Sequence, residues 1–425
     1  MSDSHLIGQI VEAAETLPPD RLLYHIRPEP APPGGDWESA VASALAKPIG
    51  KPPLAEMARG VGNAVILVDD LTRPTPQRRI LPPLIGCLNS AGVRDEDITL
   101  IVALGTHRYM SKAELRERFG EDICSRVRVL NHEWQDPAMF VNLGVTPNGT
   151  PIKVNRIADE ADLLIGVGSI VPHLYAGWAG GAKILQPGVC ASETTAGTHA
   201  MAALDGDLMG IAGRADNRVR HEMEQVAAMA GLDFILNVVV DPAGAPVWAG
   251  AGDFIEAHRA GISAARRTYV RSIPEPADVV VIDARPTTKD YWQAVKSLGH
   301  ACRGLKRGGT AILVGELSEG IAQTHLEFEP HALEPYENIV SAGKAGKIGD
   351  RIAFAALCAH ALIMAHCRVI CVSDGMTESD KRKLGFLHVD TVPEALEAAL
   401  SESAEGATVG IIEHGGDVLP APRKA

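Results

Sequence analysis

The sequence lacks the features that mark secreted, membrane-bound or disulfide-stabilised proteins. Its seven cysteines are an odd number and none forms a C-x-x-C pair, so neither a disulfide framework nor a zinc ribbon is indicated. The most apolar run, residues 353–367, is short for a membrane span and is interrupted by His360 and His366. The N-terminal stretch contains acidic residues and lacks the apolar core of a secretory signal. These absences predict a reduced, cytoplasmic protein with no membrane partner.

Basic charge is also scarce relative to acidic charge. The formal net charge is −13, which argues against a phosphate-backbone partner, so no nucleic-acid partner is expected. The 425 residues are 46% apolar and 22% charged, as in ordinary soluble proteins large enough for about two domains. Aromatic residues make up only 4%, whereas alanine and glycine are abundant. This mixture suits close packing of helices on a sheet.

Three apolar runs in the first half are predicted to be buried strands, and each leads into polar side chains. Residues 63–68 precede DDLTRPTP, residues 98–104 precede GTHR with His107, and residues 161–167 precede a glycine-rich stretch. Ligands of open α/β sheets bind where parallel strands end, so these loops are predicted to converge on one site. Within DDLTRPTP, the planar guanidinium of Arg73 suits a carboxylate or a phosphate.

Each of these loops also has a simpler explanation. An aspartate or threonine of DDLTRPTP would cap a helix predicted at residues 77–89. A single histidine such as His107 is more often a structural hydrogen-bonding residue than a catalyst. The convergence of several such loops favours a site over these alternatives.

The glycine-rich stretch, residues 171–199, reads VPHLYAGWAGGAKILQPGVCASETTAGTH. Its glycines let the backbone turn sharply and approach a ligand closely. His173 can move protons near neutral pH or bind a metal. Apolar neighbours disfavour the cationic form of Lys183, which suits a nucleophile or an attachment point. His199 is expected to be a ligand or a helix-start residue, and a glycine-rich surface loop with incidental histidines is the alternative for the whole stretch.

The second half alternates strands and helices after a predicted linker at residues 272–276. The predicted strands are 278–283, 310–314, 368–372 and 408–412, and the predicted helices are 292–305, 351–366 and 392–401, with a turn at 306–309 ending the first helix. The whole pattern predicts an α/β fold with two domains, residues 1–272 and 277–425. Each has a largely parallel sheet flanked by helices, with the active site in the cleft between them. The extreme C-terminus is free to pack back on the first domain.

Two further groups of residues in the second half carry reactive side chains. Gln293 and Lys296 share a helix face, from which they would reach a carboxylate across the cleft; a solvated helix face is the alternative. A second group matches no common zinc spacing and is expected in the core, with its role left open. Its members are Cys358, His360, His366, Cys367 and Cys371.

Taken together, these motifs resemble the nickel-dependent lactate racemase family, whose members racemise or epimerise 2-hydroxyacids. The resemblance runs in order through DDLTRPTP, GTHR, VPHLYAGWAGGAKILQPG, His199, YWQAVKS and the GELSEG of residues 315–320. It covers most of the chain. It implies a two-domain α/β fold and a covalently bound nickel-pincer nucleotide, the nickel complex of a pyridinium-3-thioamide-5-thiocarboxylate mononucleotide.

The resemblance also implies a role for each residue of the motifs. Lys183 would hold the cofactor through a thioamide, His199 would bind nickel, and His107 and His173 would be the acid/base pair. Substrate would be positioned by Arg73, Gln293 and Lys296. The loop Asp70, Leu71, Thr72 and Arg73 would contact cofactor or substrate. The position before Gln293 is aromatic in relatives, and here it is Trp292. The pocket for the substrate tail is therefore expected to differ in shape from theirs.

The expected reaction is racemisation by reversible hydride transfer from the substrate α-carbon to the cofactor. This route avoids a carbanion beside a carboxylate and needs a base on each side of the substrate. The expected partners are a small 2-hydroxyacid and the cofactor-biosynthesis proteins, without which the protein would be expressed in its apo form. The substrate stays open among lactate, malate, longer or aromatic hydroxyacids and sugar acids. Arg108 and Arg285 are the candidates for binding a second carboxylate, and a homo-oligomer is also open.

Two other functions remain as alternatives. One is a zinc-dependent hydrolase or lyase using His107, His173 and His199. The other is a non-catalytic nucleotide or small-acid binder on the same fold.

Overall fold

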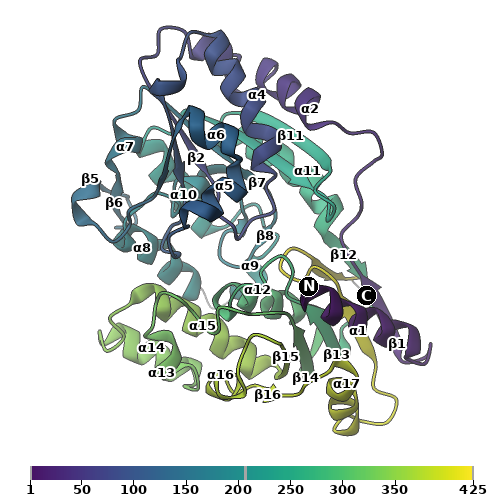
Figure 1. Cartoon of the computed structure of the whole chain (residues 1–425). Helices are drawn as coiled ribbons and strands as arrows, with labels where there is room; N and C mark the ends of the chain where they lie inside the picture. The colour runs from purple at the N-terminus through teal and green to yellow at the C-terminus, as the bar shows by residue number, and fades with distance from the viewer. Residues whose placement is uncertain (1, 205–207, 424–425) are drawn as a thin grey trace.

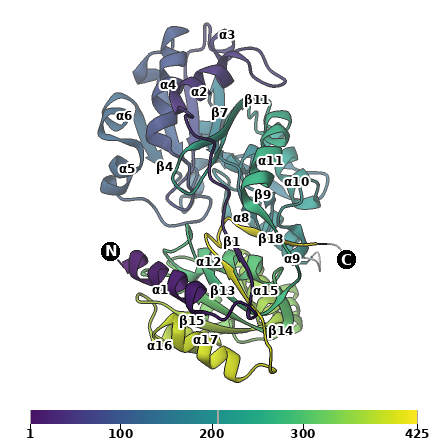
Figure 2. The same cartoon turned by 90° about the vertical axis from the view of Figure 1, so that its right-hand side faces the viewer.

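The computed structural model describes residues 2–204 and 208–423 and contains two six-stranded sheets (Figures 1 and 2). The first sheet has, in spatial order, β11 (Pro246–Gly252), β10 (Phe234–Val240), β7 (Leu163–Ser169), β2 (Ala64–Val68), β3 (Ile98–Val102) and β4 (Arg128–Asn131). All neighbouring strands are parallel except β10 and β11, which form a hairpin. The three apolar runs predicted as strands are the central strands of this sheet.

Both faces of the first sheet are covered, which explains why its central strands are apolar along their whole length. One face packs on α2 (Trp37–Ala46), α3 (Leu54–Met57), α4 (Gln77–Ser90), α5 (Lys112–Phe119) and α6 (Glu121–Arg126). The other face packs on α7 (Arg156–Asp159), α8 (Ser192–Ala203), α10 (Arg218–Met229) and α11 (Glu256–Tyr269). Successive residues of β2 alternate between the two cores, as the two-residue period of a strand requires.

The second sheet is entirely parallel in the order β1 (Leu22–Ile26), β17 (Val409–Ile412), β13 (Ala277–Asp283), β14 (Leu305–Val314), β15 (Arg368–Val372) and β16 (Leu387–His388). One face packs on α12 (Tyr291–Ala301), α14 (Tyr336–Lys344) and α15 (Arg351–His366), and the other on α1 (Ser2–Thr16) and α17 (Val392–Ser401). Two short helices, α13 (Phe328–His331) and α16 (Glu378–Lys383), complete this half. The predicted α/β fold with two largely parallel sheets is confirmed.

The N-terminal segment differs from its predicted placement. Residues 2–26 pack with the second sheet, although the sequence had assigned them to the first domain: β1 pairs with β17, and Leu6 and Ile10 of α1 lie in the core beside α17. This pairing joins residues almost 400 positions apart, so no local pattern reveals it. The turn predicted at residues 306–309 is likewise wrong. These residues lie inside β14, whose register against β13 shifts at this place.

The two halves are joined by strands and helices as well as by the chain connection. The C-terminal strand β18 (Leu419–Pro422) pairs in parallel with β12 (Val270–Ile273), which leads out of the first half. Helix α8 of the first half packs on α15 of the second, where Ala200 and Ala203 share a core with Ala353. The remaining elements lie in the first half and are β5 (Phe140–Val145), β6 (Pro151–Asn155), β8 (Pro172–His173), β9 (Gly177–Trp178) and α9 (Leu208–Ile211). Across the described ranges, no helix has both the length and the apolar character needed to cross a membrane.

Candidate active site

A cavity of about 100 Å³ brings together the polar residues that the sequence singled out. It is lined by the loops that follow β2, β3 and β7, by α8, and by α12 and α15 of the second half. Of the residues given a role, Leu71 alone is absent from its wall and lines a neighbouring cavity of about 50 Å³. The others are Asp70, Thr72, Arg73, His107, His173, Lys183, His199, Trp292, Gln293 and Lys296.

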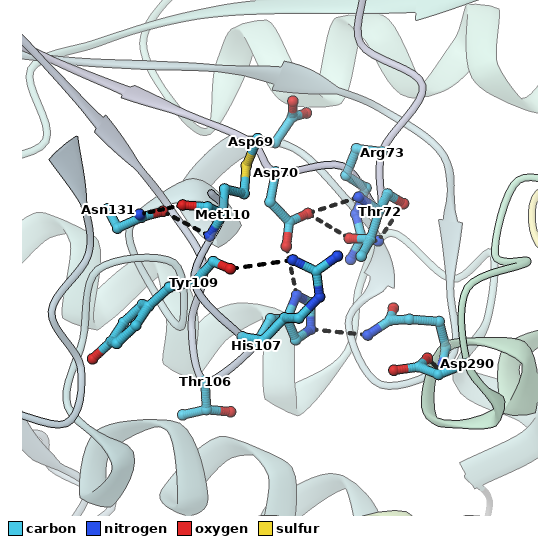
Figure 3. A network of polar contacts seen from close by, with 12 residues as sticks. Asp69, Asp70, Thr72, Arg73, Thr106, His107, Tyr109, Met110, Asn131 and Asp290 are labelled. Carbon is cyan, nitrogen blue, oxygen red and sulfur yellow. Dashed lines mark hydrogen bonds and ion pairs between the residues drawn. The ribbon is translucent and has the colours of Figure 1, made fainter. Parts of the chain in front are cut away.

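His107 is held on both sides of its ring (Figure 3). Its Nδ1 lies 2.7 Å from Asp70 Oδ2, and its Nε2 lies 3.0 Å from the amide nitrogen of Gln293. Because a carboxylate only accepts, the ring proton belongs on Nδ1, and the Nε2 lone pair accepts from Gln293. Burial lowers the pKa of His107, and the cations Lys296 and Arg73 add to this effect while Asp70 opposes it. His107 is therefore arranged as a neutral base.

Asp70 is fixed by its own loop. Its Oδ1 accepts from the backbone N–H of Thr72 at 3.0 Å and from the Thr72 hydroxyl at 2.5 Å (Figure 3). Burial alone would raise the pKa of the Asp70 carboxyl, but His107, Arg73 and Thr72 together hold it well below its usual range. The helix-capping explanation of this loop is wrong, since α4 begins after Pro76 with no side-chain cap.

His173 is buried in β8 and is held by the backbone that follows it. The N–H groups of Tyr175 and Ala176 both lie 3.3 Å from its Nδ1. These donors need a lone pair, so the ring proton of His173 belongs on Nε2, the opposite tautomer from His107. Burial lowers the pKa of His173 well below 6.5, and the neighbouring Lys183, Lys296 and Arg73 lower it further.

Lys183 lies in the short 3₁₀ turn Gly181–Ile184, and its amine has no hydrogen bond or ion pair to any described residue. Burial lowers its pKa well below 10.5, and the cations Arg73 and Lys296 contribute to this shift. An amine in this setting loses its proton readily and becomes a nucleophile. The expected reactivity of Lys183 thus has a physical basis in its surroundings.

Three residues that the sequence analysis missed hold the glycine-rich loop in place. Arg220 donates to the carbonyl oxygens of Gly180, at 3.0 Å, and Trp178. Asn237 Oδ1 accepts from the backbone N–H of Gly181 at 2.7 Å, and His258 Nε2 lies 2.9 Å from a further carbonyl oxygen of the loop. The sequence feature that could have pointed to this bracing is Asn237, a polar residue inside the apolar strand FILNVVV.

His199 lies within α8 rather than at its start. Its Nδ1 donates to the carbonyl oxygen of Thr195 at 2.9 Å, which leaves the Nε2 lone pair for a ligand. The ring packs at 5.2 Å from that of Tyr175. Burial lowers the pKa of His199 to about 3, so the ring is neutral near pH 7.

The polar side chains of α12 are buried, so the solvated-face explanation is wrong. Gln293 is 4% exposed and Lys296 is 8% exposed. Lys296 Nζ donates to Gln293 Oε1 at 2.5 Å, which leaves the Gln293 amide nitrogen to face His107. Burial, with Arg73 nearby, lowers the pKa of Lys296 well below 10.5. No carboxylate of the described residues forms an ion pair with Arg73, whose guanidinium donates to Thr72 at 3.0 Å.

Three hydroxyl groups on the cavity wall lack a partner. Ser169 Oγ, Tyr175 Oη and Thr195 Oγ1 are buried and form no hydrogen bond with any described residue. Buried polar atoms are almost always paired, so these hydroxyls are available to hydrogen-bond a polar ligand.

In the described part of the chain, the metal-binding groups considered from the sequence are not formed, and the histidines of the cysteine–histidine group bond other residues. Within residues 2–204 and 208–423, no three His, Cys, Asp or Glu side chains are grouped to hold a metal ion, so the three-histidine zinc site is not formed. In the cysteine–histidine group, His360 bonds the Tyr291 hydroxyl at 2.6 Å and His366 bonds a backbone carbonyl at 3.0 Å. Directly after β4, the buried His132 also lies outside the site and bonds Asn155 and a backbone carbonyl, each at 3.1 Å.

The fold and this site define an α/β enzyme with two histidines of fixed and opposite tautomer beside an unpaired lysine. Comparison with known proteins identifies the family. Residues 11–210 match the lactate racemase N-terminal domain and residues 273–419 match the lactate racemase C-terminal domain, so the chain belongs to the lactate racemase family and is an isomerase of the racemase type.

Individual relatives are similar over nearly their whole length. The chain is 30% identical to a lactate racemase of Lactiplantibacillus plantarum and 28% identical to one of Thermoanaerobacterium thermosaccharolyticum, with 90% of each chain covered. The structure of a lactate racemase apoprotein from T. thermosaccharolyticum superposes with a TM-score of 0.85 at 26% identity, covering 95% of this chain and 96% of that one. A Thermotoga maritima protein shares the fold, with a TM-score of 0.74 at 20% identity.

Proposed function

We propose that this protein racemises a small 2-hydroxyacid with one carboxylate, such as lactate. The observation that carries the proposal is the pair His107 and His173, which line one cavity with opposite tautomers beside the cations Arg73 and Lys296. Racemisation needs proton-transfer groups that act on both faces of the substrate, and neutral imidazoles suit this role near pH 7.

The residues of the cavity fit a covalently bound nickel-pincer nucleotide. Lys183 has a free amine for the covalent bond, His199 has a free Nε2 for nickel, and the unpaired hydroxyls of Ser169, Tyr175 and Thr195 offer hydrogen bonds. When bound, the group supplies an electron-poor acceptor for the substrate α-hydrogen, which no side chain provides.

The chain's own residues hold the substrate and move its hydroxyl proton. Arg73 and Lys296 are placed to bind the carboxylate, and the burial of Lys296 strengthens this attraction. His107 takes the hydroxyl proton at Nε2, while Asp70 stabilises the resulting imidazolium. His173 donates its Nε2–H to the same oxygen from another loop. When the α-hydrogen returns to the other face, the oxygen recovers one proton from this pair, and the proton that His107 took restores the neutral state of both rings.

The charges around the cavity favour a single carboxylate. Arg108 is held by Glu114 and Glu319, both within 2.8 Å, and Arg285 lies 2.6 Å from Asp283. Neither arginine is left to bind the second carboxylate of malate. The part of the wall formed by Val295, Ile352 and Ala356 is apolar, which favours a short apolar substrate tail over the hydroxyls of a sugar acid.

The test is peptide-resolved mass spectrometry with nickel analysis on protein co-expressed with the cofactor-making proteins, followed by chiral chromatography of lactate and malate. We expect a sulfur-containing adduct on Lys183, nickel near one per chain, and interconversion of the lactate enantiomers with little action on malate. The K183A variant should carry no adduct. An unmodified Lys183 without nickel, from cells proven to make the cofactor, would overturn the proposal.

The histidine roles are tested separately. Replacing either histidine by asparagine, in His107→Asn or His173→Asn, removes a general acid/base, so we expect kcat to fall roughly 10²–10⁴-fold. Adduct and nickel content should stay at the wild-type level. His331→Asn, at a half-buried histidine outside the cavity that pairs with Glu334, serves as the control and should keep full activity. Racemisation at the wild-type rate by either active-site variant would refute the acid/base assignment.

A further inference from the structure

His325 is a buried histidine that the proposed reaction does not use. It lies in the loop before α13, and its φ of +61° is in the left-handed region that side-chain-bearing residues rarely adopt. Both ring nitrogens are bonded, Nδ1 to Asp350 Oδ2 at 2.7 Å and Nε2 to the Thr106 hydroxyl at 2.8 Å. The two hydrogen bonds hold the imidazole ring of His325 in one orientation. The surrounding structure also keeps its backbone in a conformation that is unfavourable for histidine.

The hydrogen bonds of His325 cross from the second half of the chain to the first. Asp350 accepts from Nδ1, so Nε2 carries a lone pair and accepts the proton of the Thr106 hydroxyl. Asp350 also caps α15 by accepting from the backbone N–H groups of Ile352 and Ala353. Thr106 immediately precedes His107. His325 therefore links the start of α15 to the backbone that carries His107.

The ring faces of His325 make a second link to His107. Trp292 stacks on one side, with centroids 4.7 Å apart and planes 18° apart, and Trp134 stacks more loosely at 6.1 Å and 22°. The Trp134 indole N–H donates to the backbone carbonyl of His107 at 2.9 Å. Trp292 immediately precedes Gln293, whose amide nitrogen lies against His107 Nε2.

We propose that His325 is a positioning residue for His107. This inference rests on the proposed function, in which His107 exchanges a proton with the substrate. His325 does not line the active-site cavity, so it acts on His107 through the backbone and ring of that residue and not through the substrate. It fixes the loop through Thr106 and Trp134 and fixes the Gln293 contact through Trp292. Without it, the His107 ring is expected to lose its alignment toward the substrate hydroxyl.

The test compares His325→Phe with His331→Phe in the cofactor-loaded enzyme. His325→Phe keeps an aromatic ring for stacking but removes both hydrogen bonds. We expect kcat to fall about 10- to 100-fold, as for a small misplacement of a catalytic group. KM should change less than about threefold, because Arg73 and Lys296, which are placed to hold the carboxylate, remain in place. Adduct and nickel content should match the wild type, and His331→Phe should keep full activity.

A second variant tests the route of the effect. Thr106→Val removes the hydroxyl that bonds His325, so the double variant with His325→Phe should be no slower than the slower single variant. If the double variant lost kcat by the product of the two single reductions, Thr106 and His325 would act independently, and the proposal would be overturned. So would an unchanged kcat in His325→Phe, or a loss confined to KM.

A failure of the proposed function can be told apart from a failure of this inference. If the wild-type protein carries no adduct and racemises no 2-hydroxyacid, the apo protein still reports on His107. Its ring signals in NMR spectra, assigned by their absence in His107→Asn, should shift in His325→Phe and stay unchanged in His331→Phe. Unshifted His107 signals in His325→Phe would overturn the positioning role whatever the reaction is.

Discussion

At the scale of single residues, the candidate active site combines buried histidines with neighbouring cations. Burial lowers the pKa of His107 and of His173 below 6.5, and the nearby cations add to the shift. A base is active when neutral, and a histidine with a lowered pKa stays neutral at more acidic pH. We therefore expect kcat/KM to stay flat from pH 8 to 6.5 and to fall only below 6.5. An acid limb with its midpoint above 6.5 would contradict this reading.

The same environment affects stability through Asp417, a buried residue between β17 and β18. Burial raises the pKa of its carboxyl to about 7 from 3.8, although Arg73 and Lys296 oppose the shift. The folded protein then binds this proton more tightly than the unfolded chain does. Its contribution to stability is present below pH 3.8 and is lost as the pH rises through about 7.

Asp417→Asn imitates the protonated form at every pH. In thermal melts of the apo protein, we expect the variant to exceed the wild type by more at pH 8 than at pH 5. The gain at pH 8 should be at most about 4 kcal/mol, the full linkage value of such a shift. An equal gain at both pH values would show that the carboxyl does not titrate in this window.

At the scale of elements, the loop that carries Lys183 depends on a glycine where no other residue fits. Gly181 has a φ of +59°, and an added Cβ would lie 2.8 Å from the His258 ring. Gly181→Ala should lower the free energy of unfolding by roughly 1–3 kcal/mol and reduce adduct formation on Lys183. The control is Gly86→Ala inside α4, where nothing lies within 4 Å and the helix should gain up to about 1 kcal/mol. Urea denaturation measures both changes, and a Gly181→Ala protein as stable as wild type would refute the argument.

Elements whose pattern is local were predicted well from the sequence. Helix 351–366 and strand 368–372 match α15 and β15 at both ends, because continuous apolar sequence and a capping aspartate mark them directly. The loops after β2, β3 and β7 were predicted to converge, and they line one cavity, because parallel strands share an edge. Both features are determined by sequence patterns that span only a few residues.

Residues that act at long range were not predictable in this way. Arg220 braces the glycine-rich loop from a helix about 40 positions away, and its sequence context is that of an ordinary amphipathic helix. His325 lies in a segment without a periodic pattern, and its partner Thr106 is 219 positions earlier in the chain. The Arg220 contacts become visible only once the first half is folded, and the His325 contact only when the two halves are placed against each other.

At the scale of the whole molecule, the chain crosses between its halves more than once. It begins in the second sheet with α1 and β1, builds the first sheet, and then completes the second (Figure 2). Hydrogen bonds and ion pairs between the halves, such as Arg108 with Glu319, lie next to His107. The active-site geometry therefore depends on both halves being folded and docked.

This crossing has a consequence for dissecting the chain. A fragment of residues 1–272 carries α1 and β1 without their sheet, so the apolar side chains of Leu6, Ile10 and Ile26 would be exposed. A fragment of residues 27–272 lacks that segment but keeps the whole first sheet. Since exposed apolar surface and an unpaired strand promote aggregation, the shorter fragment should give more soluble protein and a sharper thermal transition. Both fragments lack the β18 partner of β12, so this loss cancels in the comparison. Equal yield and equal melting of the two fragments would mean that residues 2–26 find an alternative place on the first half.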